Sequence, residues 1–364
     1  MIKWIVLFVT VWYTLGCTSN NTVQRIESSG SVVKYKDNEP ESERFANLYP
    51  GKKSYPFTCT ENCYPISSNV ICQLDSPAEN CVFQGEQQVS EIDAGFSIKW
   101  LGHASFYIET DDGTSFLFDP VSKQFDWPVN WAFRFDSGFN RKAPTWLDDQ
   151  QVSAVNGVLY SHIHYDHFNK DDITDIGTNP QYFAPLDFAK HFPDRGFNLK
   201  EMAWFSSVKL NNVDIHFVPA HHFSSRIWVP YLYDDNDMTL WGGWVLEYNG
   251  KRLFFAGDTG YSKHFEDIQQ RYGDMDICLI PIASYYHEEN GDWYRYVHTT
   301  PEDALAAADE LNCKLMIPWG YGNSSWKMGD HSSHSALLRL LHMHNELKPK
   351  TPLYILNEGE SVDL

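Results

Sequence analysis

The sequence predicts an α/β sandwich. Short apolar or alternating runs recur from about residue 95 onward and are typical of strands, among them "FSIKWLGHASFYIET", "TSFLFDPV", "GVLYS", "VDIHFVPA" and "KRLFFAGD". Segments such as "TPEDALAAADELN", which opens with a Thr-Pro-Glu start signal, and "SHSALLRLLHMHNEL" are typical of helices between the strands. No repeat of fixed period is present. We therefore expect one body over residues 91–364, although this pattern alone also fits a doubly wound sheet.

Composition and charge narrow the function. The chain has 364 residues, of which 43% are apolar, as in a globular protein with a substantial core. Its 28 basic and 48 acidic residues give a net charge of −20, which repels a phosphate backbone. We therefore expect no nucleic-acid partner.

The N-terminus "MIKWIVLFVTVWYTLGCTSNN" predicts an export signal over residues 1–17. Its apolar run from Trp4 to Leu15 is shorter than the roughly 20 residues that a membrane-spanning helix needs. "TLGC" resembles a bacterial lipoprotein cleavage box with Cys17 as the lipidated residue, although Thr14 stands where such boxes usually carry Leu. We expect an exported protein of the periplasm or cell envelope, held at the membrane through Cys17. Ordinary cleavage near Cys17 and an uncleaved anchor are the alternatives.

Two further segments precede the main body. Residues 18–55 are polar, charged and without apolar periodicity, which predicts a tether that need not pack. A cysteine-rich segment, residues 56–90, follows with Cys59, Cys63, Cys72 and Cys81. No CxxC pair is present, so two disulfides are favoured over a zinc knot, and the pairing stays open. Cys278 and Cys313 lie in apolar stretches, and we expect them to be reduced core residues.

The stretch "YSHIHYDHFN" predicts a metal site. His162 and His164 lie two apart in an extended segment leaving a strand, so they point to the same side and can share one ion. Asp166 and His167 then enter a turn or helix, which redirects them toward a second, neighbouring position. Imidazole and carboxylate ligands suit Zn²⁺ best, with iron or manganese as alternatives.

Two other segments supply candidate ligands. In "IHFVPAHHFSSR" an apolar strand runs into the pair His221 and His222. In "KRLFFAGDTGY" a buried strand ends at Asp258. A carboxylate at the end of so apolar a run is costly unless it is paired or ligated.

Together these segments resemble the metallo-β-lactamase superfamily of binuclear metallohydrolases. The finer resemblance is to the branch that contains N-acylphosphatidylethanolamine phospholipase D and bacterial outer-membrane or lipoprotein hydrolases. It is carried by "RFANLYPG", "KWLGHASFYIE", "LFDPV", "YSHIHYDHFN", "PAHHFSSR", "LWGGWVLEYNGKRLFFAGDTGYSKHFEDI", "MDICLIPIASY" and "HTTPEDAL". It covers roughly residues 44–320 and implies a metallo-β-lactamase-type αββα sandwich.

The resemblance also implies a set of metal ligands for two zinc ions. His162, His164 and His222 would bind one ion, Asp166 and His167 the other, and Asp258 would bridge them. His222 is favoured over His221 because the family ligand comes immediately before "F-S".

Other residues match supporting positions of the family. Asp119 in "FDPV" matches a carboxylate that supports the site, and His298 in "HTTPEDAL" matches a histidine beside the substrate. We therefore expect Asp119, Asp166 and His298 to take part in catalysis. His103 in "GHAS" either supports the site from outside the ligand set or is a hydrogen-bonded histidine at a strand end.

One position departs from the family. Relatives carry the last ligand of the second zinc in a histidine just before Trp-Gly, whereas this chain has Pro318 there, in "KLMIPWGYGN". The second site is then one ligand short unless His298, His331, His334 or water fills the gap. A single-zinc enzyme and a binuclear enzyme with a weak second site both stay open.

The family's chemistry is hydrolysis by metal-activated hydroxide. A bound metal ion lowers the pKa of water from about 15.7 to about 7, and phosphodiester hydrolysis suits two cations that steady the attacking and leaving oxygens. We expect a zinc-dependent, phospholipase D-like phosphodiesterase for N-acylphosphatidylethanolamine-type phospholipids. The alternatives are a lactonase, an esterase or another phosphodiesterase of the same fold, and a catalytically silent surface-binding protein.

Overall fold

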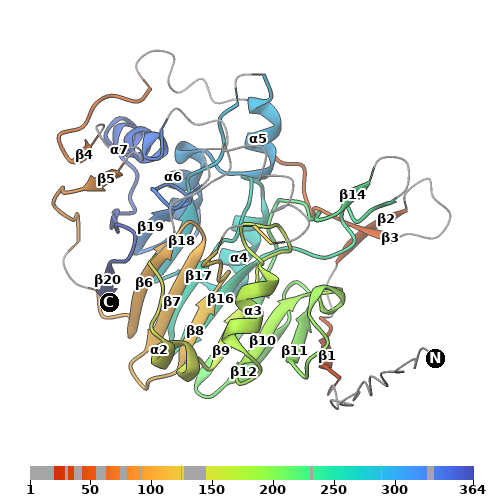
Figure 1. Ribbon diagram of the computed structural model, residues 1–364. Coiled ribbons are helices and arrows are strands. Elements are labelled where there is room, and N and C mark those ends of the chain that lie inside the picture. Colours follow the sequence, from red (N-terminus) through yellow and green to blue (C-terminus); the bar gives the residue numbers. More distant parts are fainter. Residues whose placement is uncertain are drawn as a thin grey trace, which may run out of the picture.

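A computed structural model of the chain describes residues 20–28, 32–36, 43–54, 63–73, 80–89, 92–123, 125–126, 145–229, 233–287, 289–325 and 332–364. Two β-sheets face each other at its centre, and helices cover their outer faces (Figure 1). The larger sheet has the strand order β1 (Thr22–Ile26), β11 (Asn198–Met202), β10 (Gln181–Pro185), β9 (Gly157–Leu159), β8 (Ser115–Phe118), β7 (Ser105–Thr110), β6 (Phe96–Gly102) and β20 (Ser361–Asp363). The smaller sheet has the order β12 (Ser207–Leu210), β13 (Val213–Val218), β16 (Gly243–Tyr248), β17 (Lys251–Phe255), β18 (Ile277–Pro281) and β19 (Leu315–Trp319). The predicted α/β sandwich is confirmed.

Short strand pairs and helices complete the described structure. The pairs are β2 (Val33–Lys36) with β3 (Glu43–Ala46), β4 (Val70–Gln73) with β5 (Asn80–Phe83), and β14 (Trp228–Val229) with β15 (Tyr233–Asp234). The helices are α2 (Asp149–Ala154), α3 (Lys170–Ile176), α4 (His264–Tyr272), α5 (Gly291–Val297), α6 (Pro301–Glu310), α7 (Ser335–Leu347) and the short 3₁₀ helix Ala189–His191.

Alternating side chains separate an inner core from outer layers, because successive residues of a strand point to opposite faces. In β8, Phe118 packs between the sheets, whereas Leu117 joins a second apolar cluster beneath α3. The ring of Phe118 lies 5.1 Å from that of Phe255 on β17, across the space between the sheets. Phe254, the neighbour of Phe255, points outward and contacts Phe265 of α4. The layers therefore follow the order helix, sheet, sheet, helix.

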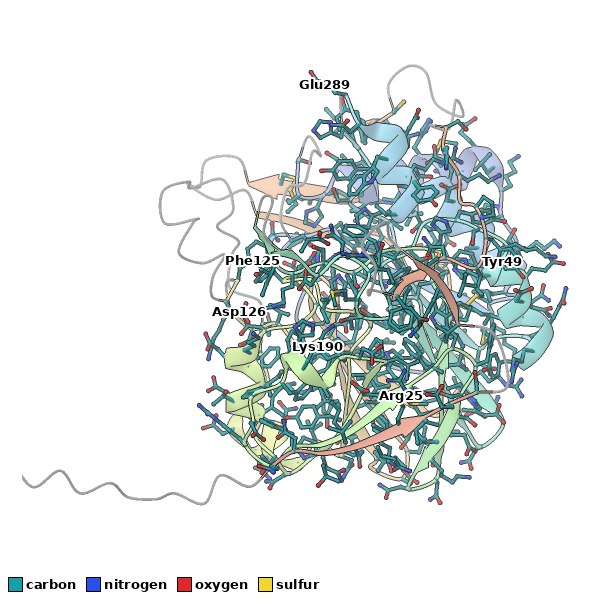
Figure 2. All side chains as sticks on the ribbon, turned by 90° about the vertical axis from the view of Figure 1, so that its right-hand side faces the viewer. Arg25, Tyr49, Phe125, Asp126, Lys190 and Glu289 are labelled. Carbon is teal, nitrogen blue, oxygen red and sulfur yellow. A yellow bond between two sulfur atoms is a disulfide. The ribbon has the colours of Figure 1, made fainter. Side chains whose placement is uncertain are left out.

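The prediction that residues 18–55 form an unpacked tether is wrong for the part that the structure describes. β1 pairs in parallel with β11 and extends the larger sheet. Arg25 on this strand, labelled in Figure 2, forms an ion pair with Asp187 at 2.8 Å. Phe45 on β3 is 1% exposed and belongs to the inner core. The segment looked unstructured because an edge strand keeps most of its side chains in water and needs no long apolar run.

The cysteine-rich segment, residues 56–90, contains disulfides as expected. Cys72 and Cys81 are bonded to each other and join β4 to β5, with their Cα atoms 4.0 Å apart. Cys63 is also disulfide-bonded. Cys59 lies outside the described residues.

The prediction that Cys278 and Cys313 are reduced is wrong. They form a disulfide between β18 and the turn that precedes β19. Both side chains are buried in apolar surroundings. Those surroundings are the same for a buried thiol and for a buried disulfide, so the local sequence does not distinguish the two.

Some predictions fall on parts of the chain that the structure does not describe. The signal segment, residues 1–17 with Cys17, is one of them, and His331 is another. Within the described residues, no helix is both long enough and apolar enough to cross a membrane.

The candidate site residues gather where strands of both sheets end. Asp119 follows β8, and the histidine-rich segment follows β9, the parallel neighbour of β8. His222 comes after β13, and Asp258 after β17 in the facing sheet. His103 lies in the turn between β6 and β7 with a positive φ of 51°. Ligands of α/β proteins bind outside the carboxyl ends of strands, so this rim is the expected place for a site.

Replacing Phe45 by Ala tests whether the N-terminal segment is part of the folded body. We expect the free energy of unfolding to fall by about 3–5 kcal/mol, because a fully buried ring is removed from the core. Urea denaturation followed by circular dichroism measures this change. In the control Val33→Ala the altered side chain is 37% exposed, and we expect a change within about 0.5 kcal/mol. Equally small changes in both variants would restore the tether interpretation.

Candidate metal centre

The histidine-rich segment turns back on itself above the strand ends. The amide of His167 donates a hydrogen bond to the carbonyl oxygen of His164 (3.1 Å), which closes the turn that the spacing predicted. Gly257, which follows β17, approaches the same place with a φ of 61°. A Cβ atom on Gly257 would lie only 2.8 Å from the Cβ atom of Ser161. Glycine is therefore required here, and its close approach brings Asp258 to the histidines.

The first group of candidate ligands consists of His162, His164, His222 and Asp258. One ligand atom from each residue lies within 4.8 Å of the ligand atoms of the other three. Nδ1 of His164 lies 2.8 Å from Nε2 of His162 and 3.2 Å from Nε2 of His222. The structure thus brings together the three histidines predicted to share one ion. His221 points elsewhere, with its Nδ1 atom donating to the carbonyl oxygen of Tyr296 (2.7 Å).

Hydrogen bonds on the far side of the rings determine which nitrogen atoms can bind a metal. Nδ1 of His222 donates to the carbonyl oxygen of Val297 (2.9 Å), which leaves the lone pair of the neutral ring on Nε2. The hydroxyl group of Ser161 donates its hydrogen to a buried carboxylate (2.5 Å) and so accepts from Nδ1 of His162 (2.9 Å). The ring of His162 is then also unprotonated at Nε2. Both Nε2 atoms point at Nδ1 of His164, so lone pairs converge.

The second group consists of His103, Asp166 and His167, whose ligand atoms also lie within 4.8 Å of one another. Nε2 of His103 is 3.1 Å from Oδ2 of Asp166, and Nε2 of His167 is 3.8 Å from the same oxygen. Among the described residues, the buried Nε2 atom of His167 has no hydrogen-bond partner. Burial would lower the pKa of His167, but Asp258 and its other carboxylate neighbours raise it well above the usual value. A proton there takes the place that a cation would take.

Asp258 lies between the two groups. Its Oδ2 atom is 3.2 Å from Nε2 of His167 in the second group and 3.8 Å from Nε2 of His222 in the first. This is the position that the resemblance implies for a bridging carboxylate. His298 stands beside it, with Nε2 3.3 Å from the same oxygen.

The donor set fits divalent metal ions. Burial lowers the pKa of His162 and His222 well below the usual value and that of His164 to about 4, so these rings are neutral at physiological pH. Burial would raise the pKa of Asp258, but His167 lowers it well below the usual range. Neutral imidazoles and an ionised carboxylate are the ligands that zinc prefers. Without protons between them their lone pairs repel one another, and a cation removes this repulsion.

Asp119, which was predicted to be catalytic, contacts the candidate ligands and their neighbours and does not point into the space where an ion or substrate would lie. It is fully buried. Its carboxylate accepts hydrogen bonds from Nδ1 of His167 (2.7 Å) and from the amide (2.7 Å) and hydroxyl group of Ser161. These bonds orient the ring of His167 so that its Nε2 atom faces the other members of the second group. Asp119 is therefore a positioning residue, of the kind that tunes metal ligands from outside.

Arg226, for which no role was predicted, supports the histidine-rich segment on the side away from the candidate ligands. Its Nη1 atom donates to the carbonyl oxygens of Ile163 and Phe168, both at 2.8 Å. Its Nη2 atom pairs with the buried Asp126, labelled in Figure 2. Its guanidinium carbon lies 4.0 Å from the centroid of the Tyr165 ring. Arg226 stands four residues after His222 in the quoted motif, but only the fold shows that its side chain turns toward the histidine-rich segment.

Asn47 was missed as well. Its Nδ2 atom donates to the carbonyl oxygen of His222 (2.8 Å), and the amide of His222 donates to its Oδ1 atom (2.9 Å). Trp241 donates to the same Oδ1 atom (3.0 Å). The residue lies in "RFANLYPG", which the sequence analysis used for the resemblance alone. The N-terminal segment therefore holds the backbone of a candidate ligand in place.

Arg226→Lys tests this support. Lysine keeps a positive charge, but its single ammonium nitrogen cannot contact Asp126 through one nitrogen and both carbonyl oxygens through another, as the guanidinium group does, so the histidine-rich segment should lose part of its support. We expect zinc to bind about 10–100-fold more weakly, the usual effect of losing a residue that supports ligands. Competition with a chromophoric chelator measures the affinity. The exposed Arg195→Lys serves as control, and equal zinc affinity in both variants would remove Arg226 from the support of the site.

The chain is similar in sequence and fold to a known protein family. Residues 114–321 match the family described as the beta-lactamase superfamily domain, which covers more than half of the chain. An uncharacterized protein of Mycobacterium tuberculosis is 28% identical over 253 residues, 67% of this chain. The chain spans 63% of the length of this mycobacterial relative.

Two further similarities concern named hydrolases. The N-acyl-phosphatidylethanolamine-hydrolyzing phospholipase D 1 of Caenorhabditis elegans is 27% identical over 245 residues, which are 63% of this chain and 65% of that protein. Among solved structures, a metallo hydrolase from the archaeon Ignicoccus hospitalis superposes with a TM-score of 0.51 at 19% identity, over 73% of this chain and 97% of that one. This structural likeness concerns the fold. The domain match, the two-sheet sandwich and the ligand-bearing rim confirm the predicted resemblance: the chain belongs to the beta-lactamase superfamily and has the metallo-β-lactamase fold.

Proposed function

We propose that this chain is a zinc-dependent phosphodiesterase of the phospholipase D type, which cleaves N-acylphosphatidylethanolamine-like phospholipids to phosphatidic acid and an N-acylethanolamine. The observation that carries this proposal is an aromatic groove that opens at His222, one of the candidate metal ligands. The two ligand groups support the hydrolytic chemistry. The similarity to the phospholipase D of Caenorhabditis elegans supports the substrate class.

The groove has a volume of about 780 Å³, which is within the usual range for small-molecule sites. It is lined by Phe45, Ala46, Asn47, Leu48, Tyr49, Pro50, Lys53, His222, Phe223, Asn236, Asp237, Trp241, Trp293, Tyr296 and Val297. Most of these side chains are apolar or aromatic, and Tyr49 is labelled in Figure 2. An acyl chain laid along such walls gains roughly 25 cal/mol for each Å² of apolar surface removed from water.

The groove also offers a cation for a phosphate group. Lys53 is exposed on its wall, with the ammonium group 5.2 Å from the centroid of the Tyr296 ring. An ammonium group beside an aromatic wall suits an amphiphile whose acyl part lies on the rings and whose phosphate is anionic. The polar end of such a substrate would then be close to His222.

The chain's own residues would divide the catalytic work. Bound divalent ions supply Lewis acidity and lower the pKa of water from about 15.7 to about 7. Asp166 offers a carboxylate that can orient the attacking water through a hydrogen bond. His298 is positioned to donate a hydrogen bond from Nε2 either to Asp258, 3.3 Å away, or to a phosphoryl oxygen of a substrate bound beside it.

Substrate turnover tests the proposed function. Purified protein supplied with zinc should convert N-acylphosphatidylethanolamine in mixed micelles to phosphatidic acid and N-acylethanolamine, which mass spectrometry detects. In His164→Ala we expect turnover to fall at least about 100-fold, because the ring that both other imidazoles face is lost. His342→Ala on α7, outside both ligand groups, should keep full activity. Turnover of lactones or carboxylic esters without any phosphodiester would favour the lactonase or esterase alternative, and absence of both zinc and turnover would favour a binding protein.

Trp293→Ala tests the groove separately from the chemistry. The side chain is 47% exposed, so its removal should leave the fold intact. We expect the KM for a long-chain N-acylphosphatidylethanolamine to rise about fivefold or more, the effect of losing roughly 1 kcal/mol of apolar contact. The rate with a small soluble phosphodiester should not change. Leu347→Ala, which alters another exposed apolar side chain (48%) on α7, is the control, and identical kinetics in both variants would argue against the groove as the acyl site.

A further inference from the structure

Pro318 leaves the second ligand group one member short of what relatives carry. The residue is buried in β19 and pairs with Ile280 of β18. β19 forms one edge of the smaller sheet, where a residue without an amide hydrogen is tolerated. A proline side chain has no donor atom for a metal. Some other group must complete this position if a second ion binds.

His103 reaches the second group from the β6–β7 turn of the larger sheet, which lies opposite the sheet that contains β19. The β6–β7 turn holds it in the left-handed region, with a φ of 51°. Its backbone is anchored, because Nε1 of Trp100 donates to its carbonyl oxygen (2.9 Å). The side chain is 8% exposed and places Nε2 3.1 Å from Oδ2 of Asp166. Non-glycine residues in this conformation are uncommon and cluster at functional sites.

The hydrogen bonds of the ring leave Nε2 as the nitrogen that faces the second group. The hydroxyl group of Ser325 donates its hydrogen to the carbonyl oxygen of Tyr321 (2.8 Å). It can therefore only accept from Nδ1 of His103, 3.1 Å away. Nδ1 of the ring then carries a hydrogen, and Nε2 is the nitrogen that faces a carboxylate oxygen of Asp166, 3.1 Å away. A metal ion can take the place of a proton between these two atoms, because both are metal ligands. The same logic applies to His162 and His222 in the first group.

The other histidines considered for this role are less suitable. Nε2 of His298 contacts Asp258 at 3.3 Å, but the residue belongs to neither group of converging ligand atoms. His334 is buried near Tyr321, with its Nδ1 atom 3.0 Å from the hydroxyl group of the adjacent Ser333. His331 lies outside the described residues.

We propose that His103 binds the second metal ion through Nε2 and replaces the histidine that this chain lacks at position 318. The ion would be a divalent transition metal such as zinc, held by His103, Asp166 and His167 and bridged by Asp258. The inference rests on the proposed function, since it concerns the same centre. It adds that the chain binds two metal ions, because the β6–β7 turn supplies the ligand that completes the second site.

Metal counting with matched variants tests the inference. Each protein is dialysed against buffered zinc, and zinc per chain is measured by elemental analysis, with circular dichroism confirming the fold. We expect about two ions in the unaltered chain and about one in His103→Gln. Glutamine can still donate a hydrogen bond to Asp166 but has no imidazole lone pair, so it separates a ligand from a mere hydrogen-bond donor. His298→Gln should keep two ions.

A rescue variant gives a second, independent readout. In the double variant His103→Gln with Pro318→His, the family's own ligand returns, and we expect zinc content to rise again toward two. Cobalt substitution should show the same loss and return in the intensity of the visible absorption bands, without reference to activity. Two ions in His103→Gln, or one in the unaltered chain, would overturn the inference while leaving a hydrolase. A chain without any zinc would overturn the proposed function itself.

Discussion

The candidate metal centre brings the lone pairs of buried side chains close together. These lone pairs repel one another, and hydrogen bonds from the surrounding residues hold the side chains in place against that repulsion. The unprotonated Nε2 atoms of His162 and His222 both face Nδ1 of His164, at 2.8 and 3.2 Å. Left alone, such groups would turn away or take up protons. Two of these rings are instead held from their far side, His162 by Ser161 and His222 by the carbonyl oxygen of Val297, and Asp119 holds His167 of the second group in the same way. A framework of this kind lowers the cost of organising the ligands before a cation arrives, because their orientations are already set.

The N-terminal segment connects the candidate metal centre with the groove proposed for the substrate. Asn47 holds both backbone groups of His222, and its neighbours from Phe45 to Pro50 line the groove that opens at the same histidine. Movement of this segment would displace a ligand and a groove wall together. The buried Phe45, whose amide donates to the carbonyl oxygen of Asp237 (2.8 Å), opposes that movement by attaching the segment to the body. The position of the groove relative to the metal centre is therefore set by packing rather than by a flexible connection.

The local sequence pattern was sufficient to predict site residues whose positions follow from their spacing in one extended segment. It was insufficient for residues whose positions depend on a turn or on contacts between distant segments. The alternation of an extended segment places His162 and His164 on one side, and an apolar run that ends in Asp258 indicates a buried carboxylate with a partner. His103 could not be assigned in this way, because its approach to Asp166 depends on a positive φ in a hairpin turn. The support from Arg226 and Asn47, the Cys278–Cys313 disulfide and the pairing of β1 with β11 likewise depend on contacts between segments far apart in the chain.

The number of bound ions determines how much positive charge a phosphodiester would meet at the centre. Asp119, Asp166 and Asp258 bring three negative charges to the centre, and the imidazoles of the first group are neutral. With one divalent ion and a protonated His167, whose neighbouring carboxylates raise its pKa well above the usual value, the sum of −3, +2 and +1 is about 0, which gives no attraction for an anionic substrate in a chain whose net charge is already −20. Two ions give −3 and +4, about +1, which attracts the phosphate and steadies the charge that develops on its oxygens. A second ion would thus supply the positive charge that the proposed phosphodiester hydrolysis needs. Since Pro318 contributes no ligand, the affinity for that ion depends on the imidazole that the β6–β7 turn delivers.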